Sequence, residues 1–121
     1  MMRYLTVPQV LYIHQQLIEQ TGGHLGLREG ELLDSAVHRP QATFGGEDLY
    51  RTIRDKVAAL LESLVKNHPF IDGNKRVGYA AMEAFLRING YVLNASEAEK
   101  YACVMAVAQG TMRFDAIKSN G

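Results

Sequence analysis

Nine consecutive residues, His68 to Arg76, bring five chemically active side chains together in this chain. The string HPFIDGNKR contains an imidazole, a carboxylate, an amide, an ammonium and a guanidinium, while a proline and a glycine bend its backbone. Imidazole is the side chain that most readily takes up a proton near neutral pH. His68 is therefore the candidate general base. Asp72, the only carboxylate of the segment, is the candidate ligand for Mg²⁺, which one carboxylate commonly holds together with phosphate oxygens and water.

The second half of this segment is expected to begin a helix and to attract an anion. The first N–H groups of a helix lack intrahelical partners and carry the positive end of the helix dipole. Lys75 and Arg76 add two cations to this turn, where they oppose the dipole unless an anion is bound. Gly73 leaves room for backbone N–H groups to approach phosphate oxygens, and Asn74 offers side-chain donors at the same mouth. The pattern therefore predicts a phosphate site.

Each of these residues also has an ordinary structural interpretation. A histidine at the end of a helix often only favours the dipole, an aspartate before a helix can be its N-cap, and an arginine is usually a solvated surface residue. Their joint occurrence in one short segment favours an anion site over three separate explanations. Phe70 is expected to face inward and anchor the segment, and His14, on an apolar helical face, is expected to be packed.

The rest of the chain reads as a series of helices that would position this segment. Apolar residues recur with a period close to 3.6, and no segment shows sustained alternation of period two, so the expected fold class is all-α. Capping residues, prolines and glycines delimit six expected helices. They run from Thr6 to the Gly22-Gly23 pair and then over about 29–39, 48–67, 74–89, 96–110 and 112–118.

The third and fourth of these helices are expected to form a packed central pair. The helix over 48–67 has an apolar stripe wide enough to be buried centrally. Small residues such as Gly78 and Ala81 on the next helix would let its neighbour approach closely. The segment from His68 to Arg76 would then connect the two helices at one end of the pair.

Length and composition predict a single domain over residues 1–121 and exclude several classes of protein. The chain is 47% apolar and 21% charged, which excludes wholesale disorder. Thirteen Lys and Arg balance thirteen Asp and Glu, so direct binding of nucleic acid is not expected. No apolar run approaches the ~20 residues of a membrane span, and no export signal core follows the N-terminus. The single cysteine, Cys103, fits a reducing compartment, so the expected location is the cytoplasm.

The segment HPFIDGNKR resembles the signature of the Fic/Doc superfamily, His-x-Phe-x-Asp/Glu-Gly-Asn-x-Arg. Its Asn-Lys-Arg is closer to the death-on-curing (Doc) toxins than to Fic enzymes, which have Asn-Gly-Arg in this place. The stretches GLREGELLDSAVHRPQATFGGEDLY and FLRINGY also look like Doc toxins, so the similarity covers at least residues 4–93. The resemblance implies a compact six-helix bundle.

The resemblance also implies a role for each residue of the segment. His68 would be the general base and Asp72 the metal ligand, while Gly73 and Asn74 would cradle phosphates and Arg76 would clamp them. ATP and Mg²⁺ are the implied substrate and cofactor.

Two positions depart from the Fic pattern and bear on the type of transfer. Lys75 replaces the second glycine of the motif, and Tyr79 stands where Fic enzymes have a second arginine. Fic enzymes transfer AMP to a protein hydroxyl, and a long cationic side chain occupies space that this reaction leaves open. Doc toxins share the lysine, and for them the resemblance implies an inverted nucleotide and transfer of its terminal phosphoryl group.

The expected function is therefore that of a toxin from a type II toxin–antitoxin system. It would phosphorylate a Ser/Thr hydroxyl on a translation protein of the elongation factor Tu type and arrest growth, and a Phd-type antitoxin would cover its active-site groove. Phe44, in the glycine-containing loop 40–47, is either an anchor in a target-binding flap or the plug of an ordinary loop. AMP transfer, a ribonuclease-like toxin and a non-catalytic nucleotide-binding module remain the alternatives.

Overall fold

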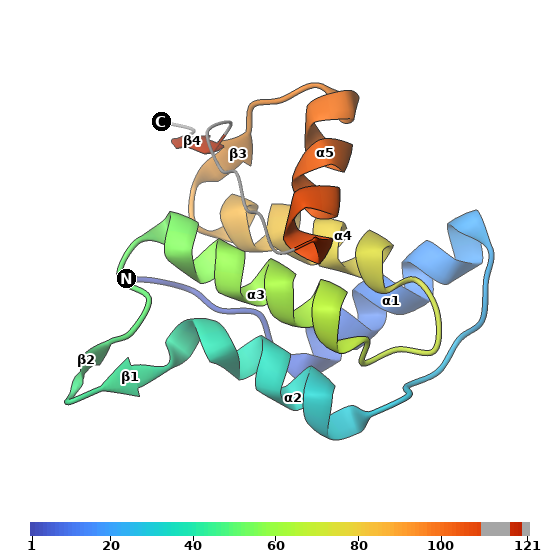
Figure 1. Cartoon of the computed structure of the whole chain (residues 1–121), viewed down its shortest axis with the longest axis horizontal. Helices are drawn as coiled ribbons and strands as arrows, with labels where there is room; N and C mark the ends of the chain where they lie inside the picture. Colours follow the sequence, from blue (N-terminus) through green and yellow to red (C-terminus); the bar gives the residue numbers. More distant parts are fainter. Residues whose placement is uncertain (110–116, 120–121) are drawn as a thin grey trace.

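The computed structural model describes residues 1–109 and 117–119 and is mostly helical within them, as the all-α prediction requires (Figure 1). Its α-helices are α1 (Val7–Thr21), α2 (Gly30–His38), α3 (Ile53–Asn67), α4 (Asn74–Ile88) and α5 (Glu97–Ala108), and a 3₁₀ turn, η1 (Arg39–Gln41), follows α2. Two short antiparallel pairs were not expected: β1 (Thr43–Phe44) with β2 (Glu47–Asp48), and β3 (Tyr91–Leu93) with β4 (Ile117–Ser119). None of the described helices is long and apolar enough to cross a bilayer.

The helix starts follow the capping residues of the sequence. Thr6 and Ser96 each form a capping box at the start of α1 and α5. The side chain of Thr52 accepts a hydrogen bond from the N–H of Asp55, so α3 begins at Ile53 rather than near residue 48. The expected earlier start was wrong because residues 47–48 pair with 43–44 in a hairpin closed by two glycines with positive φ.

The predicted sixth helix over 112–118 is not confirmed. Residues 110–116 lie outside the described part of the chain, and Ile117–Ser119 form strand β4, so a helix at 117–118 was wrong. These residues pair with Tyr91–Leu93, more than twenty positions earlier in the chain. Local periodicity cannot reveal a backbone partner at that separation, because three residues are too few for alternation to be recognised.

The predicted central pair is confirmed. Helix α3 is buried along most of its length and contacts α2, α4 and α5, which surround it in Figure 1. Helix α4 packs tightly against it at Gly78, where an added Cβ atom would lie 2.8 Å from Val65 Cγ2 and 3.1 Å from Leu61 Cδ1. The absence of a side chain at Gly78 thus sets the spacing of the two helices that carry the loop 68–73.

Candidate functional site

The loop 68–73 joins the C-terminus of α3 to the N-terminus of α4 at one end of the central pair (Figure 1). It borders a cavity of about 420 Å³. The lining residues are His68, Ile71, Asp72, Gly73, Asn74, Lys75 and Arg76. The fold therefore gathers the predicted base, metal ligand and phosphate-binding residues around one cavity.

His68 lies at the rim of this cavity, exposed to solvent. It follows the last residue of α3 and has φ 51° and ψ 58°, in the left-handed region. Among the described residues it is the only non-glycine residue with a positive φ. An exposed imidazole bordering a cavity can reach a hydroxyl group presented from outside, which is the geometry that a general base for an external acceptor needs.

Phe70 anchors the middle of the loop in the core. Its ring is 1% exposed and stacks on His14 with the ring centroids 3.8 Å apart and the planes 9° from parallel. His14 Nε2 lies 2.7 Å from the carbonyl oxygen of Asp72, to which it donates because that oxygen can only accept. The inward Phe70 and the packed His14 were both predicted, and both are confirmed.

Asn74 has a different role from the one its sequence position suggested. Its side chain is buried, and its amide bonds the backbone of Phe70 twice: Oδ1 accepts from Phe70 N–H and Nδ2 donates to Phe70 C=O, each at 2.9 Å. The expectation that this side chain offers donors at the mouth of the cavity was wrong, because both ends of the amide close the loop. What Asn74 can still offer an anion is its backbone N–H in the first turn of α4.

The carboxylate of Asp72 is held by three protein donors. Oδ2 accepts from the N–H of His24 at 3.2 Å, and Oδ1 accepts from the N–H of Gly73 at 2.8 Å. Arg76 Nη2 lies 3.5 Å from Oδ1. The hydrogen bonds from His24 and Gly73, followed by the charge of Arg76, hold the pKa of Asp72 below its ordinary value. The group is therefore a fixed anion at neutral pH.

Asp72 retains capacity for one bond to a metal ion. A carboxylate offers about four lone-pair positions, and the three protein donors leave one of them. Among the residues that the structure describes, no group of three or more His, Cys, Asp or Glu side chains could hold a metal. This donor set fits Mg²⁺ held by one protein carboxylate with phosphate oxygens and water as its other ligands, which is how Mg²⁺ commonly binds with nucleotides.

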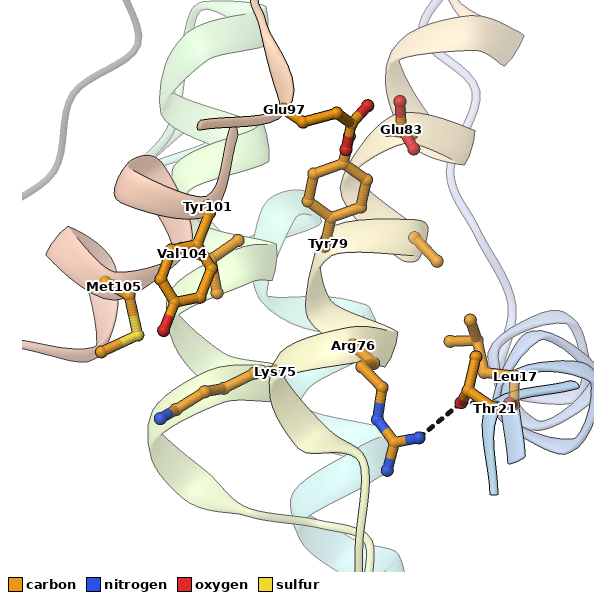
Figure 2. Close-up of a pocket in the computed structure, with 11 residues that line it drawn as sticks. Leu17, Thr21, Lys75, Arg76, Tyr79, Glu83, Glu97, Tyr101, Val104 and Met105 are labelled. Carbon is orange, nitrogen blue, oxygen red and sulfur yellow. Dashed lines mark hydrogen bonds between the residues drawn. The ribbon is translucent and has the colours of Figure 1, made fainter. Parts of the chain in front are cut away.

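Lys75 and Arg76 leave the first turn of α4 on different sides. Figure 2 shows Arg76 directed toward α1, where its guanidinium donates to Thr21 Oγ1 and, at 2.8 Å, to the carbonyl oxygen of Gly22. Lys75 is exposed and borders the loop cavity. Arg76 thus supplies a positive charge in a fixed position beside Asp72, whereas the ammonium of Lys75 faces solvent and any ligand in the cavity.

A second hollow, the α5 groove, adjoins the loop cavity between α1, α4 and α5 (Figure 2). It has a volume of about 430 Å³ and shares Lys75 and Arg76 with the loop cavity. Its other lining residues are Leu17, Thr21, Tyr79, Ala80, Glu83, Glu97, Tyr101, Val104 and Met105. One end of the groove is therefore cationic and the other acidic, with mostly apolar and aromatic side chains between them.

Tyr79, at the place of the second arginine of the Fic motif, lies toward the acidic end of this groove. Its pKa is raised by burial, so the phenol is protonated at neutral pH. Lys100 of α5 places its ammonium 5.9 Å from the centre of the Tyr79 ring. The same ammonium pairs with Glu97 at 3.3 Å and with Glu83 at 3.8 Å. A cation is thus present near position 79, but two carboxylates already neutralise it.

Phe44 is not brought to the loop cavity. It is 81% exposed in the β1–β2 hairpin, and Figure 1 shows this hairpin beside the N-terminal end of α3. The loop 68–73 lies at the C-terminal end of the same helix, and fifteen residues of α-helix span roughly 20 Å. The length of α3 therefore separates Phe44 from the loop, and its role as an anchor in a target-binding flap stays a prediction.

Sequence reasoning missed the residues between α1 and α2 that surround the loop. Gly23 leaves space that Asp72 Oδ2 occupies, since an added Cβ atom would collide with that oxygen. Arg28 binds the carbonyl oxygens at the end of α3. In the sequence, the Gly22-Gly23 pair indicates only the end of a helix. No local pattern indicates contacts with residues some forty to fifty positions later.

Known proteins are similar to this chain over much of its length. The model of the family described as Fic/DOC matches residues 4–86, which include the whole loop and most of α4. A protein described as Toxin Doc from Mycolicibacterium smegmatis is 55% identical over 74 residues. That match covers 61% of this chain and 57% of the relative, so the chain aligns with little more than half of that protein.

Proposed function

The chain belongs to the Fic/DOC family, and from this membership and the geometry of the loop we propose that it is a toxin of a type II toxin–antitoxin system. Its proposed reaction is transfer of the γ-phosphoryl group of ATP to a Ser or Thr hydroxyl of a translation protein. The protein that it resembles over 74 residues is itself described as a toxin. Growth arrest would follow from modification of the target.

One observation carries the proposed chemistry. An exposed imidazole, a carboxylate held as an anion and the uncapped N-terminus of α4 border the same cavity. Gly73, the N-cap of α4, has φ 79° and offers no side chain to the first-turn N–H groups. Those groups, with Lys75 and Arg76, present positive charge to an anion.

Each group then has a defined task in phosphoryl transfer. His68 accepts the proton of the attacking hydroxyl group. The N-terminus of α4 and Arg76 bind phosphate oxygens and stabilise the charge that spreads over the transferred group. Asp72 would hold Mg²⁺, which would supply further charge neutralisation when bound. Little covalent chemistry is asked of the protein, so the rigid attachment of the loop to the core through Phe70 is what the reaction requires of the fold.

Lys75 supports γ-phosphoryl transfer over AMP transfer. Its side chain borders both the loop cavity and the α5 groove, so it stands at the junction where a nucleotide would pass from one to the other. A glycine at this place would leave the junction open to a phosphate group. A lysine fills it and adds a positive charge, which favours binding the terminal phosphate near His68.

The lining of the α5 groove supports binding of the proposed antitoxin there. Its apolar middle fits the apolar face of an amphipathic helix, and its charged ends would fix the direction of that helix. A Phd-type antitoxin segment in this groove would cover Lys75 and Arg76 and block binding of the nucleotide.

The proposed target is an elongation factor Tu, and the proposed location of the reaction is therefore the cytoplasm.

Transfer of label from ATP tests the proposal directly. The purified chain is incubated with Mg²⁺, elongation factor Tu and ATP labelled at either the γ or the α phosphorus. We expect label from the γ position only, and none from either position with His68→Ala, although that variant should bind ATP as the wild type does. Label from the α position would establish AMP transfer instead, and RNA cleavage by His68→Ala without ATP would point to a ribonuclease.

A further inference from the structure

We propose that Arg28 is a positioning residue for the transfer reaction, because it holds the backbone of His68 in the conformation that turns the imidazole toward the loop cavity. The inference rests on the proposed function, since it takes His68 as the general base. Arg28 itself does not border the loop cavity, whose lining residues all belong to the segment 68–76. Its effect on the reaction would therefore pass through His68.

The backbone of His68 is in a conformation that needs external support. A side chain with a Cβ atom is disfavoured in the left-handed region, and helices that end there usually have glycine at this position. His68 has φ 51° and is the only described residue other than glycine with a positive φ. Such a residue stays in this region when its surroundings hold it there.

The chain after His68 cannot supply that support. A left-handed helix end is normally closed by the N–H of a following residue, which donates back to a carbonyl group of the last turn. The residue after His68 is Pro69, which has no N–H. In α1, α2, α4 and α5 the residue directly after the helix donates its N–H to the helix's own last turn. His68 has the same position after α3, and within the described part of the chain its N–H makes no such bond.

Arg28 donates instead to the carbonyl groups on either side of His68. Its Nε donates to the carbonyl oxygen of His68 and its Nη2 to that of Asn67, each at 2.7 Å. Its backbone N–H donates to the carbonyl oxygen of Pro69 at 2.8 Å. One residue thus binds three consecutive carbonyl groups centred on His68, which fixes the orientation of the peptide planes on both sides of its Cα atom.

The chemistry of this contact is specific to arginine. The guanidinium is a planar fork whose Nε and Nη donors point in parallel, so it can bind two neighbouring carbonyl groups at once. A lysine ammonium is a single point on a flexible stem and cannot reproduce the pair. Arg28 has a half-exposed side chain, so a small guanidinium ion can enter its place when the side chain is removed.

The test compares Arg28→Ala and Arg28→Lys with wild type in the transfer of γ-label from ATP to elongation factor Tu. Arg54→Ala, which removes an exposed arginine from the first turn of α3, is the matched control. We expect Arg28→Ala to lower kcat by about 10- to 100-fold, as misplacing a reactive group does, with little change in KM for ATP. Arg28→Lys should not restore kcat. Added guanidinium ion should restore part of it, whereas methylammonium should not.

Two results would overturn the inference: an unchanged kcat in Arg28→Ala, or a loss of kcat explained by a loss of folded protein in thermal unfolding. A crystal structure of Arg28→Ala gives a readout that needs no activity. We expect His68 to leave the left-handed region in it, and retention of its positive φ would contradict the proposal. If wild type transfers no label at all, the proposed function fails, and this crystal structure alone decides the role of Arg28.

Discussion

The side chains of the loop 68–73 and the first turn of α4 divide into those that hold the loop in place and those that face its cavity. Phe70 and Asn74 point into the protein and bind, respectively, the ring of His14 and the backbone of the loop itself. His68 and Lys75 are exposed at the cavity. The presence of both kinds of residue explains how a six-residue connection can be rigid and still present reactive groups to solvent.

Replacing Asp72 by Asn should remove the dependence of transfer on Mg²⁺ together with most of the activity. The neutral amide oxygen binds a hard divalent cation more weakly than an anionic carboxylate oxygen does. Activity measured across a Mg²⁺ titration checks this, with Asp34→Asn, an exposed carboxylate on α2, as the control. A variant at Asp72 that keeps the wild-type Mg²⁺ response would show that the metal binds elsewhere.

The same variant should also change how stability depends on pH. Because its N–H donors lower the pKa of Asp72 in the folded protein, the ionised group stabilises the fold at pH values above the ordinary value of 3.8. This contribution is lost as the pH falls through the lower, folded pKa. Urea unfolding should therefore show Asp72→Asn to be less stable than wild type at pH 7, with a smaller difference below about pH 3. An equal difference at both pH values would contradict this account.

Lys75→Gly tests the proposed orientation of the nucleotide. Removing the side chain restores the glycine of the Fic motif and opens the junction between the loop cavity and the α5 groove. We expect transfer of γ-label to fall by about ten-fold or more, the scale of losing one charged contact to the transition state, while some transfer of α-label appears. Lys66→Gly, an exposed lysine in the last turn of α3, provides the comparison. Undiminished γ-transfer by Lys75→Gly would refute the steric reasoning.

At the scale of the elements, the contact between α3 and α4 sets the distance between the two helix ends that the loop connects. Gly78→Ala should lower the free energy of unfolding by about 1–3 kcal/mol through overpacking, partly offset by the ~0.5–1 kcal/mol that alanine gains over glycine in a helix. Its Cβ atom would press on the stiff side chain of Val65.

Val65→Ala tests whether this one contact causes the loss of stability, because it removes the methyl group that would lie 2.8 Å from a Cβ atom at position 78. In that background the cost of Gly78→Ala should shrink or change sign, because the two sites are in contact. Denaturant unfolding of the four proteins measures the coupling. An equal loss of stability in both backgrounds would mean that the contact between residues 65 and 78 does not limit how closely α3 and α4 pack.

The elements that the sequence predicted well are those specified by local chemistry. The capped helices α1 and α5, the small-residue face at Gly78 and the inward Phe70 each follow from residues within a few positions of one another. The hairpin over 43–48 was not predicted, because two residues per strand are too few to show alternation. The start of α3 was therefore predicted too early in the chain.

Within the site, sequence reasoning located the reactive groups but not their supports. His68, Asp72 and the start of α4 were predicted from one segment, and the structure gathers them around one cavity. Arg28 and the N–H of His24 act on this segment from a loop some forty to fifty residues earlier. Such contacts depend on how α1 and α2 pack against the central pair, and no local pattern reports that packing.

At the scale of the whole molecule, the loop cavity and the α5 groove adjoin each other and share Lys75 and Arg76. A ligand in the groove and a nucleotide in the cavity would compete for these two cations. This arrangement would let the proposed antitoxin inhibit the proposed transfer without contacting His68, which borders the loop cavity but not the α5 groove.

Tyr101→Arg should weaken binding of the proposed Phd-type antitoxin by about ten-fold or more, as loss of an aromatic anchor in an interface does. Tyr101 borders the α5 groove and is 65% exposed. Tyr12→Arg is the matched control, because Tyr12 is 63% exposed but lies on a different surface, next to Leu5 and Ile88. Calorimetric titration of each variant with the antitoxin measures the effect. Equal weakening by both variants would argue against the groove as the binding surface.

The most direct measurement is a crystal structure of this chain with Mg²⁺ and an ATP analogue whose β–γ bridge is an imido group. We predict the triphosphate at the N-terminus of α4, its terminal phosphate nearest His68, and the metal on Asp72. A triphosphate bound away from the first turn of α4, or one whose α-phosphate faces the imidazole, would contradict the account.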